Sequence, residues 1–360
     1  MKRTTLLKSV LLLCALVVGS GSVWADTYIK CTSLSDLSVG GSYIIADVSG
    51  STASAMGALT DGKTKRGTIV SLSASGDVIT VGLSDEPYVF ELGGTSDGYT
   101  LLISGSTDYM SYDSGTGVKL VTTTTDDKAK WTITKNDTYG LLVYNKSATD
   151  RVFLRNGTSA ISAYSKTNLG KSGYYGTVLY KKVVPATVTS AGYATIYSDK
   201  ALNFDGTGLT AYRAVVAGDN VSFVEVTSAP AETGLLLKGD AGDYNIPTTS
   251  SPASVTSAME GTLTETTVPA GTFVLFNKGG NVAFYKTTAA SFTVGANTAW
   301  LPADISAHDF IGLDGETTNI ASVAKSLKAD NVEYYNLAGQ RVAQPTKGLY
   351  IVNGKKVIIK

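Results

Sequence analysis

The sequence predicts an all-β protein, and three observations lead to this. Short runs in which apolar and polar residues alternate recur along the chain, each bounded by Gly, Asn, Asp or Ser. Apolar residues do not follow a helical spacing, except briefly near residues 321–329. Only 17% of the 360 residues are charged, while 38 are glycine and 20 are tyrosine. Such a composition favours short strands joined by tight turns over helices.

Residues 1–25 have the features of a secretory signal peptide. A positively charged start (Lys2, Arg3, Lys8) is followed by an apolar run at residues 9–18. The run is too short to cross a bilayer comfortably, and a cleavage site with a small residue ends at Ala25. We therefore expect cleavage after Ala25 and a secreted or cell-surface protein without a transmembrane span.

Removal of the signal peptide takes away three cationic residues and leaves a net charge of about minus three. A nearly neutral chain lacks the basic patch typical of nucleic-acid-binding proteins, so we expect no nucleic-acid partner. Cys31 is then the single cysteine, which excludes an intramolecular disulfide. A mature chain of about 335 residues is long enough to bury two cores without one.

Three stretches between Tyr28 and Lys182 share one order of features. An aromatic-led strand is followed by a turn and a second strand, then by a third apolar piece and a closing strand. The closing strands lie at Phe90, Trp131 and Val178, so the period is about 40 to 50 residues. Units of this size predict a closed, pseudo-threefold barrel of the β-trefoil type at residues 26–184. A sandwich of six or seven strands is the competing interpretation.

The rest of the chain predicts a second β domain and a small terminal unit. The Val183–Ala186 stretch contains a proline and predicts a short linker. Eight short strands joined by Gly, Asn and Asp turns follow, which predict a β-sandwich or small barrel at residues 185–313. Residues 314–331 show no alternation and are expected to form a linker. At residues 332–360, two turns separate three strands, and Asn353-Gly354 is a strong hairpin signal.

Three segments resemble modules of known protein families. SLSDLSVGGSYIIAD and DDKAKWTI resemble a module of secreted Bacteroidetes proteins, and GYATIYSDKALNF with FYKTTAASFTVGANTAWLPA is similar to another such module. The ending YNLAGQRVAQPTKGLYIVNGKKVIIK resembles a short form of the C-terminal sorting domain of the type IX secretion route. The matching residues of that ending are Tyr335, Leu337, Gly339, Val342, Gly348, Tyr350 and Val352.

The resemblance implies that the secretion machinery recognises residues 332–360. Full sorting domains are longer and form a sandwich of their own. The short form therefore either docks on the preceding domain or is a relic, and a third interpretation is that it completes the sheet of the middle domain. None of the three modules carries a catalytic residue set that can be transferred to this chain.

Motifs for catalysis or cofactor binding are missing from the sequence. His308 is the single histidine, which excludes a zinc site built on several histidines. The sequence also lacks the G-x-S-x-G motif that would support a Ser-His-Asp catalytic set. The carboxylates Asp85-Glu86, Asp126-Asp127 and Glu316 stand in turn-like stretches, where side chains are usually solvated. We expect no enzyme, no metal and no cofactor, with a glycosidase as the distant alternative.

Surface recognition is the function that the sequence favours. Sugar sites combine an aromatic ring with nearby polar side chains, and the second and third units contain both. The candidate ligand-binding residues are Asp108, Tyr109, Tyr112, Asp113, Arg155, Asn156 and Tyr164. Tyr109 and Tyr112 are expected on one face of their strand, where packing explains them as well as binding does. Trp131, Phe90 and Phe153 are expected in the core. The preferred hypothesis is an exported protein that binds a glycan or a host surface protein. The alternative is a structural or protein-binding adhesin without a sugar site.

Overall fold

The structure is a computed structural model that describes residues 25–60, 65–218, 220–288, 291–305 and 309–313, together with four C-terminal strands. Every element in these ranges is a strand, apart from three single-turn helices, η1 (Leu34–Asp36), η2 (Asp127–Ala129) and η3 (Lys166–Asn168). The prediction of an all-β protein is therefore confirmed. The predicted signal segment up to residue 24, the predicted linker at 314–331 and the side chains of His308 and Glu316 lie outside the described residues.

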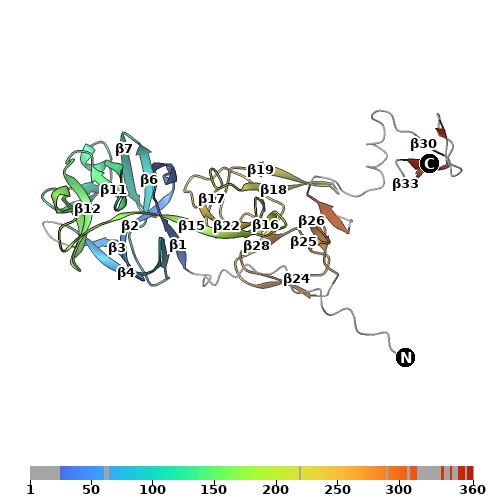
Figure 1. The fold of residues 1–360 in the computed structure, drawn as a ribbon, viewed down its shortest axis with the longest axis horizontal. Helices are drawn as coiled ribbons and strands as arrows, with labels where there is room; N and C mark the ends of the chain where they lie inside the picture. Colours follow the sequence, from blue (N-terminus) through green and yellow to red (C-terminus); the bar gives the residue numbers. More distant parts are fainter. Residues whose placement is uncertain are drawn as a thin grey trace, which may run out of the picture.

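The N-terminal domain contains the first fifteen strands (Figure 1). These are β1 (Asp26–Lys30), β2 (Ser42–Ser49), β3 (Thr52–Leu59), β4 (Gly67–Ser75), β5 (Val78–Val81), β6 (Phe90–Thr95), β7 (Gly98–Ile103), β8 (Tyr109–Tyr112), β9 (Val118–Val121), β10 (Trp131–Asn136), β11 (Gly140–Asn145), β12 (Arg151–Asn156), β13 (Ala160–Ser165), β14 (Tyr174–Gly176) and β15 (Val178–Val188).

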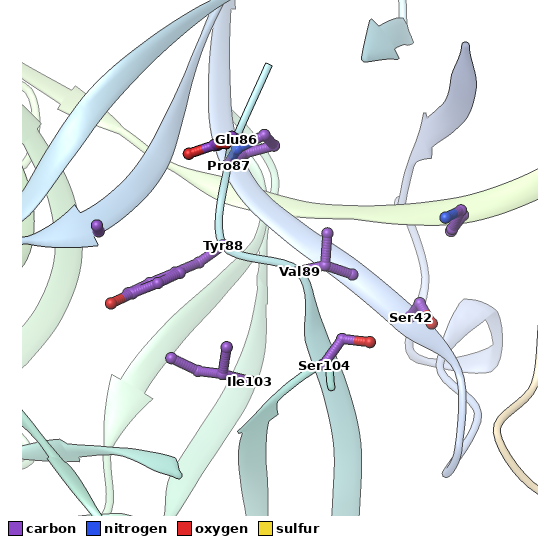
Figure 2. A pocket seen from close by; sticks show the side chains of 9 residues that line it. Ser42, Glu86, Pro87, Tyr88, Val89, Ile103 and Ser104 are labelled. Carbon is purple, nitrogen blue, oxygen red and sulfur yellow. The ribbon is translucent and has the colours of Figure 1, made fainter. Parts of the chain in front are cut away.

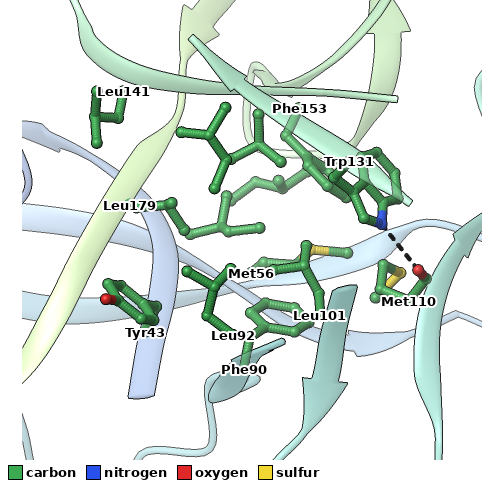
Figure 3. Packing of buried hydrophobic residues seen from close by; sticks show 14 of the residues in the cluster. Tyr43, Met56, Phe90, Leu92, Leu101, Met110, Trp131, Leu141, Phe153 and Leu179 are labelled. Atoms are coloured by element: carbon green, nitrogen blue, oxygen red, sulfur yellow. Dashed lines mark hydrogen bonds between the residues drawn. The ribbon is translucent and has the colours of Figure 1, made fainter. Parts of the chain in front are cut away.

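Six of these strands close into a ring. The antiparallel order is β2–β6–β7–β10–β11–β15, and β15 pairs again with β2. The side chains that fill the ring include Trp131, Phe90 and Phe153, all fully buried, as the sequence predicts. The Trp131 indole stacks on Phe153 and donates a hydrogen bond of 2.9 Å to the Met110 carbonyl (Figure 3). The indole therefore buries its polar group with a partner, as an interior tryptophan requires.

A second ring shares two strands with the first. Its order is β2–β3–β4–β5–β1–β15, and it closes through the same β2–β15 pair. Small side chains line part of its interior, with Ala46 of β2 opposite Ala55 of β3 and Val48 opposite Ala53. These alanines let the two strands run close beside the bulky Tyr28 and Tyr180 rings in the same core.

Strand β2 has both of its faces buried because the two rings share it. Tyr43 and Ile45 point into the first core, while Ile44 and Ala46 point into the second. Successive side chains of a strand point to opposite faces, so a strand between two cores needs apolar residues at every position. The uninterrupted run Tyr43–Ala46 meets this requirement.

The second domain contains strands β16 to β29. They are β16 (Tyr193–Ile196), β17 (Leu202–Asn203), β18 (Thr210–Ala217), β19 (Asn220–Val226), β20 (Ser228–Ala229), β21 (Leu235–Lys238), β22 (Gly242–Pro247), β23 (Glu260–Thr262), β24 (Thr266–Pro269), β25 (Phe273–Lys278), β26 (Asn281–Lys286), β27 (Ser291–Val294), β28 (Thr298–Trp300) and β29 (Phe310–Gly312). Its central sheet, β16–β21–β18–β19, also lies between two cores. Leu235 and Leu237 of β21 enter one core, and Leu236 enters the other.

The predicted linker between the domains is a strand. Residues 183–186 belong to β15, which pairs with β1 and β2 in the N-terminal domain and with β22 in the second domain (Figure 1). Pro185 lies opposite Asn245 within the β15–β22 ladder. The proline does not break the strand because its fixed φ angle is compatible with extended backbone. The predicted boundary at residues 184 and 185 therefore falls inside a continuous strand.

The C-terminal unit is a four-stranded sheet rather than the predicted three strands. Its order is β31 (Arg341–Val342), β30 (Tyr334–Tyr335), β32 (Gly348–Val352) and β33 (Lys355–Ile359). These four strands pair with each other, and the described ladders do not join them to the sheets of the middle domain. Leu337 and Gly339 of the predicted sorting signal lie outside the described residues.

We expect that Ala55→Leu destabilises the protein by about 1–3 kcal/mol, because the larger side chain overpacks the second core. Urea denaturation followed by far-UV circular dichroism measures this change. Ala58→Leu, at an exposed position of the same strand, is the matched control and is expected to have little effect. Equal stability of the two variants would contradict the packing described for this core.

Candidate functional site

The candidate residues of the second unit do not form one surface. Tyr109 and Tyr112 are three positions apart on the regular strand β8, so they point to opposite faces, and the expectation that they share a face was wrong. Tyr112 packs against the first core and donates a hydrogen bond of 3.3 Å to the Gly115 carbonyl. Asp108 and Asp113 flank the two ends of β8, roughly 16 Å apart along the strand.

The third unit places one candidate residue, Arg155, at one end of the first ring. Arg155 of β12 is buried, and its Nε and Nη2 atoms donate to the two carboxylate oxygens of Asp47 at 2.6 and 2.7 Å. The Nη1 atom donates to the Gly157 carbonyl at 2.6 Å. Each of its three nitrogens therefore has a partner in the protein. Arg155 was predicted to contact a ligand, but in the structure it supports the neighbouring side chains instead.

Asp47 reaches this position through the alternation of β2. Tyr43 and Ile45 face the first core, and Asp47 is the next residue on the same face, at the rim of the ring. The hydrogen bond with Asp47 raises the pKa of the Arg155 guanidinium, which stays charged. The bidentate ion pair between Asp47 and Arg155 at the rim thus joins the first unit to the third, although the two residues are 108 positions apart in sequence.

Tyr175 covers this ion pair from the solvent side. Strand β14 pairs with β12 so that Tyr175 lies opposite Arg155, and its ring centroid is 3.8 Å from the guanidinium carbon. The Tyr175 side chain is nevertheless 44% exposed. One face of the ring therefore rests on a fixed cation, which holds it in place, while much of the ring remains accessible to solvent.

The other third-unit candidates lie on the opposite face of the sheet from Tyr175. Asn156 is half-buried at the end of β12, opposite Tyr174, and its side-chain amide has no protein partner among the described residues. Tyr164 is only 2% exposed and packs edge-on against Tyr174 with ring centroids 5.5 Å apart. Tyr164 therefore belongs to the second core and cannot serve as the predicted platform. Only the β12–β14 pairing identifies Tyr175 as the exposed ring of the third unit.

An open hollow of about 440 Å³ lies on the wall of the N-terminal domain (Figure 2). Its lining includes Ser42, Glu86, Tyr88, Val89 and Ser104. Tyr88 and Val89 point to opposite sides of the segment that crosses the hollow (Figure 2). Tyr88 and Val89 therefore do not form one surface, and the hollow offers a ligand no continuous aromatic surface.

The carboxylates considered for glycosidase chemistry have other roles in the described part of the chain. Asp85 accepts a hydrogen bond of 2.8 Å from the Gly82 amide and closes a turn. Asp126 caps helix η2, just before Trp131, by accepting from the Lys128 amide at 2.9 Å. Asp127 forms an ion pair of 2.9 Å with Lys130, and this hydrogen bond lowers its pKa.

The described residues hold neither a metal-binding cluster nor a membrane-spanning helix. Groups of three or more His, Cys, Asp or Glu side chains with a metal-binding arrangement do not occur among them. Helices long and apolar enough to cross a membrane are also absent from the described ranges.

Comparisons with known proteins assign no family. No family model matches the chain, and no curated protein matches it. Among solved structures, it matches a chain from "Structure and mode of action of a mosquitocidal holotoxin" with 12% sequence identity and a TM-score of 0.30. The match covers 88% of this chain and 38% of the toxin chain, so this chain spans well under half the length of that protein. A likeness of this size supports no statement about fold or function.

We expect that Asp47→Ala destabilises the protein by about 3–5 kcal/mol, because the buried Arg155 charge is left without its partner. Guanidinium denaturation measures the loss. The control is Asp113→Ala, which removes a more exposed ion pair of 3.3 Å with Lys119 and should cost at most about 1 kcal/mol. A loss for Asp47→Ala as small as that of the control would mean that the rim pair is not a structural link.

Proposed function

We propose that this protein is an exported, non-catalytic surface or extracellular protein that binds a glycan through its N-terminal domain. The observation that carries the proposal is the Tyr175 ring, which is held on the Arg155 guanidinium and remains accessible. The apolar face of a pyranose packs well on such a ring. Because Tyr175 is fixed before binding, little conformational entropy is lost when a ligand stacks on it.

Tyr175 also carries a polar group that suits a sugar. Its hydroxyl has no protein partner among the residues described, and it can both donate to and accept from hydroxyl groups. Asn156 and Tyr174 are opposite each other in the β12–β14 ladder, so their side chains point to the other face of the sheet and do not join Tyr175. We therefore propose the site in the third unit, at Tyr175, instead of at Tyr109 and Tyr112.

We also propose that the N-terminal domain is a β-trefoil and the second domain a β-sandwich. The closed ring β2–β6–β7–β10–β11–β15 supports the trefoil. Along the chain, hairpin β3–β4 lies between β2 and β6, hairpin β8–β9 between β7 and β10, and hairpin β12–β13 between β11 and β15. The closing strands β6, β10 and β15 begin at Phe90, Trp131 and Val178, where the three-unit repeat places them. For the second domain, a central sheet with cores on both faces supports layered packing.

A structural or protein-binding adhesin is the second candidate. One observation favours it, because the Tyr175 ring shields a buried ion pair and so has a structural role without any ligand. Under this alternative the rigid ring contacts a protein partner, since exposed aromatic residues on a fixed support are also common at protein interfaces.

A glycan-array screen of the chain at residues 26–360 tests the proposal. We expect selective binding that Tyr175→Ala weakens about tenfold or more, because the variant loses the stacking surface. Tyr109→Ala, which alters a half-buried tyrosine of the second unit, should bind as the unchanged protein does. A folded protein that binds no glycan would favour the adhesin. Loss of binding in Tyr109→Ala alone would move the site to the second unit.

Export is proposed from the ends of the chain. Strand β1 begins at Asp26, directly after the proposed cleavage point, and Asp26 forms an ion pair with Lys182 of β15. Cleavage after Ala25 therefore leaves every described strand intact. The proposal extends to the C-terminal sheet, which the type IX secretion machinery of a Bacteroidetes cell would recognise.

Mass spectrometry of the protein recovered outside the producing cell checks both ends. We expect a mature N-terminus at Asp26, and we expect deletion of residues 332–360 to keep the protein inside the cell. An N-terminus that retains residues 1–25 would argue against cleavage. Normal export of the deletion variant would show that the C-terminal sheet is not needed for sorting.

A further inference from the structure

The second domain has a hollow of its own, separate from the site at Tyr175. Its volume is about 340 Å³, near the lower end of the range of small-molecule sites. Three aromatic side chains and one lysine converge on it. The residues that line it are Tyr193, Tyr212, Ser222, Phe223, Leu236, Lys238 and Leu313.

The hollow lies at the margin of a core, on one face of the sheet β16–β21–β18–β19. Tyr193 lies directly across from Lys238, and Tyr212 across from Leu236, so all four side chains share this face. Further along the same face, Phe223 stacks on the buried Phe284 at 5.6 Å. Because Tyr193 and Tyr212 are only partly buried against this core, their rings line an opening instead of a packed interior.

The lining is both aromatic and polar. The Lys238 ammonium group lies 5.6 Å from the centre of the Tyr193 ring. The hydroxyls of Tyr193 and Tyr212 have no hydrogen-bond partner among the described residues. The exposed Glu225 is the cross-strand neighbour of Tyr212. A purely apolar occupant would bury the two phenol hydroxyls without partners, which is costly.

We infer that this hollow is a second saccharide-binding site. A sugar ring has an apolar face that packs on the tyrosine rings, and it has hydroxyls that bond to the two phenols. This site does not depend on Tyr175, since it is built by another sheet around another core. Two sites on one chain would strengthen the attachment to a surface that displays many copies of a glycan.

The test uses the chain at residues 26–360 on a glycan array, followed by calorimetric titration with the oligosaccharide that binds best. Tyr175→Ala removes the first site. We expect this variant to retain binding to part of the array, and the added changes Tyr193→Ala and Tyr212→Ala to weaken that binding about tenfold or more. Tyr285→Ala, which alters a partly buried tyrosine elsewhere in the same domain, is the matched control and should change nothing.

The outcomes separate the two sites. If Tyr193→Ala with Tyr212→Ala binds every glycan as the unchanged protein does, the second site is overturned, while Tyr175→Ala still decides the first. If the unchanged protein binds no glycan, both are overturned. Should the double alanine variant fail to fold by circular dichroism, Tyr193→Phe with Tyr212→Phe keeps the rings and removes only the hydroxyls. This variant should also bind more weakly, and full binding would overturn the proposed role of the phenols.

Discussion

The antiparallel pair of β2 and β15 belongs to both rings of the N-terminal domain at once. Four residues of each strand, Tyr43–Ala46 and Val178–Lys181, face each other in this ladder. Alternating side chains of both strands enter the two cores, so Leu179 fills the first and Tyr180 the second. A register slip of one residue would exchange the contents of the two cores. The rim pair, the exposed ring of Tyr175 and the link to the second domain all depend on this register.

The two proposed sites are supported in similar ways. Each contains a tyrosine ring at the margin of a core, beside a cation: Tyr175 with Arg155, and Tyr193 with Lys238. In the N-terminal domain the cation is Arg155, which Asp47 fixes in place. Removing either partner of such a buried pair leaves a charge without compensation, whereas the intact pair adds little net stability. Its contribution here is geometric, since it sets where the Tyr175 ring lies.

The sequence predicted those features that depend on neighbouring residues along the chain. Alternation and turn residues predicted most strands, and the unbroken apolar run Tyr43–Ala46 reflects a strand between two cores. The proline at position 185 suggested a linker, because the sequence does not reveal that β22 supplies a partner ladder. Short strands such as β23 and β24 have too few residues to show a pattern.

The candidate site was harder to predict than the fold. Arg155 was interpreted as a ligand contact because its partner Asp47 is distant in sequence, and only the closure of the ring brings them together. Tyr164 and Tyr175 are both tyrosines of the third unit, and the sequence does not distinguish them. The pairing of their strands buries Tyr164 and exposes Tyr175. Side-chain exposure at a ring margin depends on tertiary contacts, which local patterns do not encode.

The continuity of β15 also has a mechanical consequence. A pull along this strand loads the hydrogen bonds of its ladders with β1, β2 and β22 in shear, so they must break together and not one by one. A flexible connection would instead extend under the first small force. If a surface glycan holds the N-terminal domain while flow drags on the rest of the chain, tension passes through a stiff junction. The spacing and orientation of the two domains would then persist under load.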